Sequence, residues 1–369
     1  MTEWTSCLRS LCDADAGAAF DAFAGTGPFA AYQQSRAWAQ AAPAAKHKDW
    51  LIFLCRDGAE VIGTALIRRT WLGPWRWLAT VQRGPVVQDP AKLGAVLDRL
   101  VADLRRARCC SLQLAPRIRG RDLPHAAETI RQAGFAPLPP RRQPLHVATG
   151  IVWLDKPEAD ILAGFKQRGR RQIRAAAKAG VTVRAVTDAA DIARYQALID
   201  LFRRNRPDYD MSGLPDAAGQ AALIADRGGA MLLAEREGVA IGGHAFVRQA
   251  DEAIWLSLVT DDAQAATGCS YALLWAAMRA ARAAGCVGYD LAGMPVGATV
   301  DAGEIGRAQF KTAFAPHRRI LLPMQIRAIR PLDHVLLFSA RQAYRMSRLR
   351  RLTAGRRRPA AKEHADVVR

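Results

Sequence analysis

The feature that most constrains the fold of this chain is an internal repeat. Residues 51–69 (LIFLCRDGAEVIGTALIRR) align, with one gap, with residues 231–249 (MLLAEREGVAIGGHAFVRQ). In each copy two apolar runs flank a tight-turn pair, Asp57-Gly58 or Glu237-Gly238, which predicts a β-hairpin. A strand, a helix and a second strand follow in the same order, at 77–83, 91–107 and 109–116 and again at 254–260, 269–284 and 286–293. The repeat predicts an α/β fold with mixed sheets made of two tandem copies of one unit, with a chance match of short apolar runs as the alternative.

The length of 369 residues also favours two domains, because it exceeds what one ordinary core supports. We place the boundary near residue 147, after the proline-rich segment PLPPRRQP at 137–144. The expected organisation is a first domain at 1–147, a second at 148–322, a C-terminal helix at 323–352 that completes the first domain, and a basic disordered tail at 353–369.

The chain is strongly basic, with 53 Lys and Arg against 34 Asp and Glu, a formal charge of +19. A basic surface attracts polyanions such as tRNA or anionic lipid headgroups. The charge also fits a biased genome, because only 8 of the 53 basic residues are lysines. The end of the chain is the most basic part, with ten Lys or Arg against two acids from 341 to 369. This tail predicts peripheral contact with RNA or with an anionic membrane.

Cysteine and histidine spacing points to no metal centre. The seven cysteines contain no CxxC pair and the seven histidines no HxxxH pair. The N-terminus lacks a signal-peptide pattern, and no stretch approaches 18 uncharged apolar residues. We therefore expect a cytoplasmic protein without a metal, with peripheral contact at the inner membrane face as a further expectation.

Positive charge is concentrated in one segment of the second half. Residues 165–184 (FKQRGRRQIRAAAKAGVTVR) contain seven basic residues and no acid. On a helix one face would carry Arg170, Arg171, Arg174 and Lys178, which repel one another unless an anion lies between them. A phosphate-bearing partner is the functional interpretation, and a solvated basic face is the structural one.

Three further positions have the chemistry of a site. Lys311 is the only lysine between 178 and 362, which suggests a need for a compact or titratable amine, although a loop lysine without a role fits too. Tyr271 lies at a loop-to-helix junction after Gly268, where backbone N–H groups favour an anion. Tyr289 ends a strand where α/β sheets often bind ligands, or is a buried structural residue. His244 has no visible partner and is expected to be structural.

Several of these segments, taken in order, resemble the Fem family of aminoacyl-tRNA-dependent peptidyltransferases. The resemblance covers about residues 25–350 and is carried by RGPVV at 83–87, the segment 165–184, residues 268–293 and QFKTAF at 309–314. It implies two GNAT-like acyltransferase domains, and no helical-arm insertion is present. Members of the family move an amino acid from aminoacyl-tRNA to an amine of a peptidoglycan precursor, and relatives acylate other amines.

The resemblance also implies roles for single residues. Phe310 and Lys311 match the Phe-Lys motif of the family near the reacting ester. The basic helix matches the segment that contacts tRNA or acceptor phosphates, and Tyr271 matches a tyrosine of the acceptor site. The expected substrate-binding residues are Arg83, Arg170, Arg171, Arg174, Lys178, Tyr271 and Tyr289.

Two departures from the family pattern affect the acceptor and the base. The lysine that often follows the first aromatic segment is missing after Trp38, and Lys46 comes only later. Where the family tends to have Asp-Pro, this chain has Ala115-Pro116. The first departure weakens the case for a nucleotide-sugar peptide acceptor, and the second removes the obvious general base.

We therefore predict an aminoacyltransferase that uses aminoacyl-tRNA as donor and a phosphate-bearing amine as acceptor, without a cofactor. Catalysis would rest on orientation and oxyanion stabilisation, with no covalent enzyme intermediate. Two alternatives remain: a GNAT-like N-acyltransferase that uses acyl-CoA, and a non-catalytic protein that binds polyanions or a membrane surface. A monomer is expected.

Overall fold

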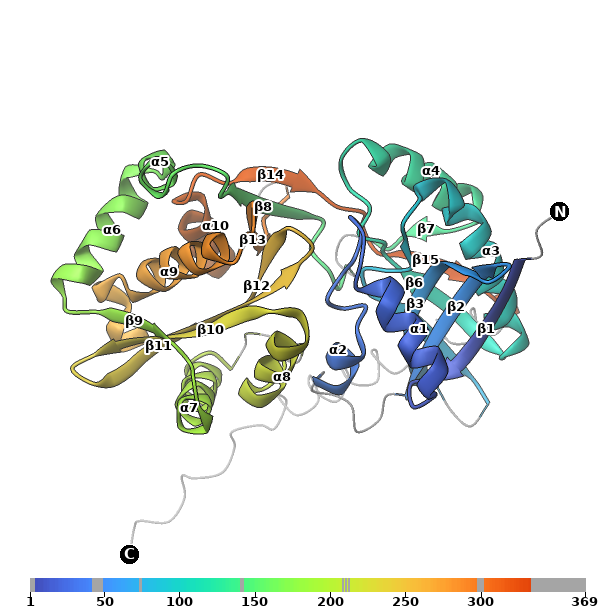
Figure 1. Cartoon of the computed structure of the whole chain (residues 1–369), viewed down its shortest axis with the longest axis horizontal. Coiled ribbons are helices and arrows are strands. Elements are labelled where there is room, and N and C mark those ends of the chain that lie inside the picture. Colours follow the sequence, from blue (N-terminus) through green and yellow to red (C-terminus); the bar gives the residue numbers. More distant parts are fainter. Residues whose placement is uncertain are drawn as a thin grey trace, which may run out of the picture.

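The computed structural model describes residues 4–41, 49–72, 75–139, 143–207, 209, 211, 213–296 and 302–332. These residues form two mixed sheets with helices packed against them, and the two sheets lie side by side in Figure 1. Among the described residues no helix is long and apolar enough to cross a bilayer.

The first unit is the sheet of β1–β7 and β15 with helices α1–α4. Its strand order is β1-β2-β3-β4-β6-β15-β7, and β5 pairs with β3. The elements are β1 (Trp4–Ser10), α1 (Ala14–Ala24), α2 (Arg36–Ala41), β2 (Asp49–Asp57), β3 (Glu60–Trp71), β4 (Trp77–Val81), β5 (Val86–Val87), a 3₁₀ turn (Pro90–Lys92), α3 (Leu93–Arg106), β6 (Cys109–Leu114), a 3₁₀ turn (Gly120–Asp122), α4 (Leu123–Gln132), β7 (Ala136–Pro137) and β15 (Gln325–Ala328).

The second unit is the sheet of β8–β14 with helices α5–α10. Its strand order is β14-β8-β13-β12-β11-β10-β9. The elements are β8 (Ala148–Trp153), α5 (Glu158–Gly164), α6 (Gln167–Lys178), β9 (Thr182–Ala185), α7 (Ala189–Asn205), α8 (Ala217–Arg227), β10 (Gly229–Arg236), β11 (Val239–Gln249), β12 (Glu252–Thr260), a 3₁₀ turn (Asp262–Thr267), α9 (Cys269–Ala283), β13 (Gly288–Gly293), α10 (Ala302–Thr312) and β14 (His317–Ile320).

The repeat expected from the sequence is confirmed in the arrangement of the two sheets. The hairpins β2–β3 and β10–β11 each carry a register shift in the strand before the turn, at Cys55/Arg56 and at Ala234/Glu235. The turn of the second hairpin needs the left-handed region at Glu237 (φ 52°) and Gly238 (φ 78°), where glycine is the favoured residue. In both units the hairpin is followed by a strand, a helix and a parallel strand.

Each core is built on the amphipathic helix between the last two of these strands. On α3 the apolar residues fall at helical spacing, and their side chains are at most 4% exposed. Helix α9 also buries an apolar face, and this face contacts β10, β11 and β12. Burying one Leu or Val side chain contributes about 2 kcal/mol, so these two faces account for much of the stability of each unit. The residues on α3 are Leu93, Val96, Leu97, Leu100, Val101 and Leu104.

Three local expectations differ from the structure. The helix expected at 323–352 is wrong at its start, because Gln325–Ala328 is strand β15, which pairs with β6 on one side and β7 on the other. The open edge of β6 needs a partner strand, and this segment supplies it. Residues 333–352 and the tail at 353–369 lie outside the described residues. The first strand, β1, was not expected, and Lys311 lies on helix α10 rather than on a loop.

A buried ionic cluster joins the two units. Glu252, the first residue of β12, is 2% exposed and accepts hydrogen bonds from Arg117 Nη2 (2.7 Å) and from both terminal nitrogens of Arg319 (2.9 and 2.6 Å). Arg119 Nη2 lies 3.6 Å from the same carboxylate. Burial raises the pKa of Glu252, but its hydrogen bond to Arg319 and the charge of Arg117 bring the pKa down to about 2. Because Arg117 and Arg119 belong to the first unit, this carboxylate holds the two sheets together.

Candidate active site at the separated strands of the second unit

The two parallel strands in the middle of the second sheet separate along their length. Strands β12 and β13 pair only from Glu252↔Gly288 to Ile254↔Asp290. Beyond Ile254, β12 continues to Thr260 beside β11 alone, so a gap opens between β12 and β13. Such a gap at the carboxyl ends of parallel strands is where α/β proteins commonly bind ligands.

Lys311, in the last turn of α10, occupies this gap. Its Nζ donates a hydrogen bond to the backbone carbonyl of Gly293 at the end of β13 (2.7 Å). The same ammonium lies 5.0 Å from the ring centroid of Trp255 on β12, a cation–π contact. Burial lowers the pKa of Lys311 to about 8, against the opposing effect of the negative charge of Asp290. A lysine with this pKa is mostly charged at neutral pH, yet can lose its proton just above it.

The backbone that binds Lys311 is itself held by Asp290. Ala292 adopts a left-handed conformation (φ 58°), which is unfavourable for a residue with a Cβ. Its N–H donates to Asp290 Oδ1 (2.8 Å), and its carbonyl accepts from Thr149 Oγ1 (2.9 Å). The Thr149 hydroxyl also bonds to Asp290, and burial raises the pKa of that carboxyl. Asp290 and Thr149 thus fix the turn at whose end Gly293 presents its carbonyl.

An aromatic cluster surrounds the other side of α10. Phe310 contacts Tyr271 with ring centroids 4.7 Å apart, Phe314 at 5.5 Å and Trp255 at 6.1 Å. Tyr271 is 8% exposed and also stacks on Phe314 at 5.7 Å. The two residues that the Phe-Lys motif pairs therefore have different roles: Phe310 anchors α10 in the core while Lys311 faces the gap.

A cavity of about 280 Å³ lies beside this gap, between the two units. Arg307 on α10 lies over the ring of Tyr209, one of its lining residues, at 5.3 Å. Trp255 also lines the cavity, and the Lys311 ammonium lies over its ring. Helix α10 therefore contacts the cavity wall at Tyr209 and at Trp255. The first unit contributes Tyr32 and Trp38, and the second contributes Phe202, Tyr209, Met211, Gly213, Leu214 and the β12 residues Trp255, Leu256, Ser257 and Leu258.

Comparison with known families assigns the domain that contains this gap. Residues 163–312 match the family model described as the acetyltransferase (GNAT) domain. The second unit carries a GNAT acyltransferase domain. Its matched residues include all of β12, α9, β13 and α10, and with them Trp255, Tyr271, Asp290 and Lys311. The sequence matches no curated protein.

Solved structures extend the likeness to the whole chain. The FemX crystal structure superposes with a TM-score of 0.72 at 16% identity, over 87% of this chain and 98% of that one. L-PGS from Bacillus licheniformis superposes with a TM-score of 0.56 at 12% identity, over 89% of this chain and 96% of that one. A tandem GNAT protein from the clavulanic acid biosynthesis pathway superposes with a TM-score of 0.53 at 13% identity, over 89% of this chain and 99% of that one. The chain has the Fem-like tandem GNAT fold, as the sequence predicts.

The predicted basic helix is α6, which packs against α9 and against the end of α10. Gly169 is required there, because a Cβ would lie 2.7 Å from the carbonyl oxygen of Ala313, just after α10. Arg170 is partly buried and donates to the carbonyl oxygens of Ala163 and Phe165, so it caps helix α5. The three other predicted residues of this face, Arg171, Arg174 and Lys178, are exposed and remain candidates for contacts with phosphate.

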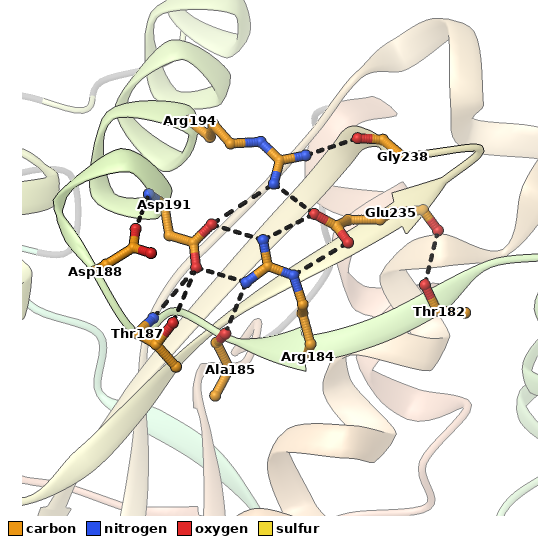
Figure 2. A network of polar contacts seen from close by, with 9 residues as sticks. All are labelled: Thr182, Arg184, Ala185, Thr187, Asp188, Asp191, Arg194, Glu235 and Gly238. Atoms are coloured by element: carbon orange, nitrogen blue, oxygen red, sulfur yellow. Dashed lines mark hydrogen bonds and ion pairs between the residues drawn. The ribbon is translucent and has the colours of Figure 1, made fainter.

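The last arginine of the basic segment has a structural role. Arg184 on β9 makes two bonds to Asp191 on α7 (2.5 and 2.6 Å) and two to Glu235 on β10 (3.1 and 3.0 Å). Arg194 joins the same carboxylates and donates to the Gly238 carbonyl, as Figure 2 shows. The Arg184 bonds hold the pKa of the Asp191 carboxyl well below its ordinary value. This network fastens α7 to the edge of the GNAT sheet.

Two predicted substrate contacts do not fit their positions. Tyr289 is completely buried, and its hydroxyl is 2.6 Å from Nε2 of His244, which burial keeps neutral by lowering its pKa to about 3. Arg83 is 3% exposed and donates from Nη2 to the carbonyl oxygen of His146, just before β8. Burial lowers the pKa of Arg83. Tyr289 is thus a core residue, Arg83 binds the segment that leads into β8, and His244 is structural as expected.

The sequence does not single out Trp255 or Thr149, and of the neighbours Tyr289 and Asp290 at the end of the strand we expected Tyr289 to bind substrate. Asp290 follows Tyr289 on β13, and successive strand residues face opposite sides of the sheet, so Asp290 reaches Ala292 and Thr149 while Tyr289 lies in the core. Thr149 is 141 positions from Asp290, and only the pairing of β8 with β13 brings them together. Among the described residues, no group of three or more His, Cys, Asp or Glu side chains is placed to hold a metal ion.

Proposed function

We propose that the chain transfers an amino acid from aminoacyl-tRNA to an amine bound in the cavity between the two units. The observation that carries the proposal is the position of Lys311, whose ammonium is held between Gly293 and Trp255 at the gap in the GNAT sheet. FemX and L-PGS, whose folds this chain shares, support aminoacyl transfer as the kind of reaction.

The proposed reaction needs few groups from the protein because the donor ester is already activated. The acceptor nitrogen attacks the ester carbonyl carbon, and a tetrahedral oxyanion forms next to Lys311. The bond between that carbon and the ribose oxygen then breaks, which leaves an amide and a ribose hydroxyl. The proton lost by the amine goes to the ribose oxygen, directly or through water. A positive charge placed at the oxyanion before the reaction lowers its energy without reorganisation.

Asp290 keeps Lys311 in the charged form that this step needs. The carboxylate raises the pKa of Lys311 against the effect of burial. It also fixes the Ala292 turn through its hydrogen bond to the Ala292 N–H, and so positions the carbonyl that orients the ammonium. Asp290 acts through Lys311 and is therefore a positioning residue in this proposal.

The loop before α9 favours tRNA over acyl-CoA as donor. A pyrophosphate there would need free N–H groups, yet Gly268 N–H points to Ala265 O (3.5 Å) and Cys269 N–H to Thr267 Oγ1 (3.3 Å). Asp261 and Asp262 open the same loop and would repel an anion. A Cβ on Gly268 would lie 2.6 Å from the Gln172 carbonyl oxygen, so α6 covers this turn closely. The exposed cations of α6 lie beside it and fit the phosphates of a tRNA end.

The acceptor is proposed to place its amine in the cavity between the units. The walls are mainly aromatic and aliphatic, with Tyr32 and Trp38 facing the β12 residues. A cavity of about 280 Å³ suits the amine-bearing end of a larger molecule. We propose that the remainder of the acceptor carries phosphate, as cell-wall precursors do, and lies along the basic surface outside.

The deciding experiment follows label from the donor. The full chain is incubated with a complete set of tRNAs charged with labelled amino acids and with the small-molecule extract of its own cells. We expect one amino acid to enter an acid-stable, amine-linked product, and ribonuclease treatment of the donor to abolish this transfer. Labelled acetyl-CoA with the same extract is the parallel reaction. Transfer from acetyl-CoA with none from any charged tRNA would refute the proposed donor.

A further inference from the structure

A second cavity lies between the two units, next to the ends of α8 and β11. Its volume is about 390 Å³, a size typical of small-molecule sites. The first unit contributes Gly25, Ala30, Ala31 and Tyr32, and the second contributes Asp226, Arg227, Arg248, Gln249 and Ala250. Glycine and alanine supply four of these nine residues, so the walls leave room for a ligand. Tyr32 lines both cavities, which are therefore neighbours.

Arg248, near the end of β11, is a partly buried cation that has no ion pair with a carboxylate among the described residues. Its stem lies across the turn after α8, where a Cβ on Gly228 would be 3.2 Å from Arg248 Cδ. Its Nε is buried and makes no hydrogen bond. Arg248 does contact the Cys286 thiol, but burial raises the pKa of that thiol and keeps it neutral. A cation held in this way is stabilised when an anion binds beside it.

Arg227 brings a second guanidinium to the cavity from the end of α8. Its Nε lies 3.0 Å from Asp226 Oδ2, so the aspartate occupies the stem side of the guanidinium. The side chain is only 16% exposed. A Cβ on Gly25, which follows α1, would lie 3.0 Å from Arg227 Nη1, so the terminal nitrogens reach across to the first unit. Within the part of the chain that the structure describes, Asp226 is the one carboxylate that pairs with Arg227, and it leaves these terminal nitrogens for a ligand.

Gln249 adds a third donor group to the wall. It is 7% exposed, and its Oε1 accepts a hydrogen bond from the Tyr32 N–H (2.8 Å). This bond fixes the orientation of the carboxamide, whose Nε2 has no hydrogen-bond partner among the described residues. Two guanidinium groups and one amide therefore face a single acidic lining residue, Asp226. Donors and positive charge both exceed acceptors and negative charge in this cavity, which favours an anionic ligand.

We propose that this second cavity is a binding site for the phosphate group of a small molecule. The planar guanidinium groups of Arg227 and Arg248 match the spacing of phosphate oxygens, and each can bind two of them. A phosphate has enough acceptor oxygens for both arginines and for the Gln249 amide, whereas the two oxygens of a carboxylate are too few. The site is independent of the transfer reaction at Lys311 and of the exposed cations on α6.

The test is calorimetric titration of the full chain with inorganic phosphate and, separately, with glycerol 3-phosphate, at constant ionic strength. Arg248→Met removes the guanidinium but keeps an unbranched stem over Gly228, and we expect it to weaken phosphate binding at least about tenfold. Arg236→Met is the matched control, because Arg236 ends the neighbouring strand β10 at the hairpin turn and is 42% exposed. The control should bind phosphate as the parent does.

Melting temperatures separate loss of the site from loss of the fold. Arg248 has no carboxylate partner among the described residues, so Arg248→Met should melt no lower than the parent without phosphate. Phosphate should raise the melting temperature of the parent and of Arg236→Met but not that of Arg248→Met. Tighter binding of glycerol 3-phosphate than of inorganic phosphate would identify a phosphate ester as the ligand, and equal binding the free ion.

Three results would overturn the proposal. The first is equal phosphate affinity of the parent and Arg248→Met, and the second is no binding by the parent in either titration. The third is loss of phosphate binding in Lys311→Met, because the phosphate would then belong to the gap in the GNAT sheet. Retention of phosphate binding in Lys311→Met supports a separate site, whether or not the chain transfers an amino acid.

Discussion

The two units contain the same hairpin, strand, helix and strand, yet only one of them opens a gap. In the first unit β4 and β6 stay paired from Trp77↔Cys109 to Val81↔Leu114, the full length of both strands. In the second unit the equivalent strands part after Ile254 and Asp290. Lys311 lies in the space that this separation creates. One repeat therefore keeps its central parallel strands paired, while the other opens the gap that Lys311 occupies.

The first residues of the two equivalent strands differ as well. β4 begins with Trp77, which is buried in an apolar core, and β12 begins with Glu252, which is surrounded by arginines from both units. A buried apolar residue packs within the core of its own unit. A buried carboxylate needs hydrogen-bonded cations, and these can come from a neighbouring domain. The second copy thus differs from the first at β12 in two ways: its first residue binds the other unit, and its later residues leave a gap beside β13.

The largest expected effect distinguishes the lysines of the two units. Lys311→Met should lower the rate of aminoacyl transfer about a hundred- to a thousandfold, because the charge beside the oxyanion is lost. Lys92→Met, just before α3 in the first unit, should leave the rate unchanged. Single-turnover transfer with the identified donor and acceptor measures both. Equal activity in the two variants would mean that the gap is not the site.

The second prediction concerns the tie between the units. Glu252→Gln should lower the free energy of unfolding by about 3 kcal/mol, because Arg117, Arg119 and Arg319 would keep their charges without a counterion. Glu128→Gln on α4 breaks an exposed pair with Arg131 and should leave the free energy of unfolding nearly unchanged. Urea unfolding followed by tryptophan emission measures both. Similar values for the two variants would make the buried cluster dispensable.

The third prediction tests the proton on Lys311. A pKa of about 8 means that the charged form, and with it transfer, should decline as the pH rises through about 8. Asp290→Asn removes the charge that raises this pKa and should move the decline about one unit lower, a loss of about fivefold at pH 8. Lys311→Arg should abolish the decline, and Asp155→Asn, an exposed control, should not move it. The measurement is the single-turnover rate of transfer against pH for the parent and the three variants.

The smallest effect is expected on the basic face of α6. Arg171→Ala should raise the KM for the charged tRNA about threefold. It should also reduce the slope of log affinity against log salt concentration by about one, because one phosphate contact is lost. Arg131→Ala, an exposed arginine of the first unit, should change neither quantity. Filter binding at several salt concentrations gives the slope. A common slope for the parent and both variants would remove α6 from the donor site.

The sequence predicted the repeated elements well because their apolar spacing is regular. Helical spacing of apolar residues predicts α3, and turn-forming pairs predict both hairpins. These pairs are Asp57-Gly58 and Glu237-Gly238. Strand β1 has mixed polar residues and half-exposed positions, so its spacing carries little signal. Strand β15 forms because β6 needs a partner on its open edge, and that need arises only after folding.

The candidate site was predictable only where a residue was chemically unusual. Lys311 stood out as a lone lysine in an arginine-rich region. Tyr271 was predicted from its place at a helix start, and the structure places it in the aromatic cluster around Phe310. Asp290 and Thr149 gain their roles through a strand pairing between residues far apart in the sequence, and Trp255 through the helix that covers it. Arg170 and Arg184 belonged to a correctly recognised basic segment, but hydrogen bonds within the second unit use their charges.

The return of the chain to the first sheet has a consequence for synthesis on the ribosome. β15 pairs between β6 and β7, yet more than 180 residues separate it from β7 (residue 137 to residue 325). Every strand of the second sheet precedes β15 in the chain and therefore emerges from the ribosome before it. The second unit is therefore able to complete its sheet during translation, while the sheet of the first unit waits with an open edge between β6 and β7. The first unit begins the chain, yet its sheet is the last to be completed.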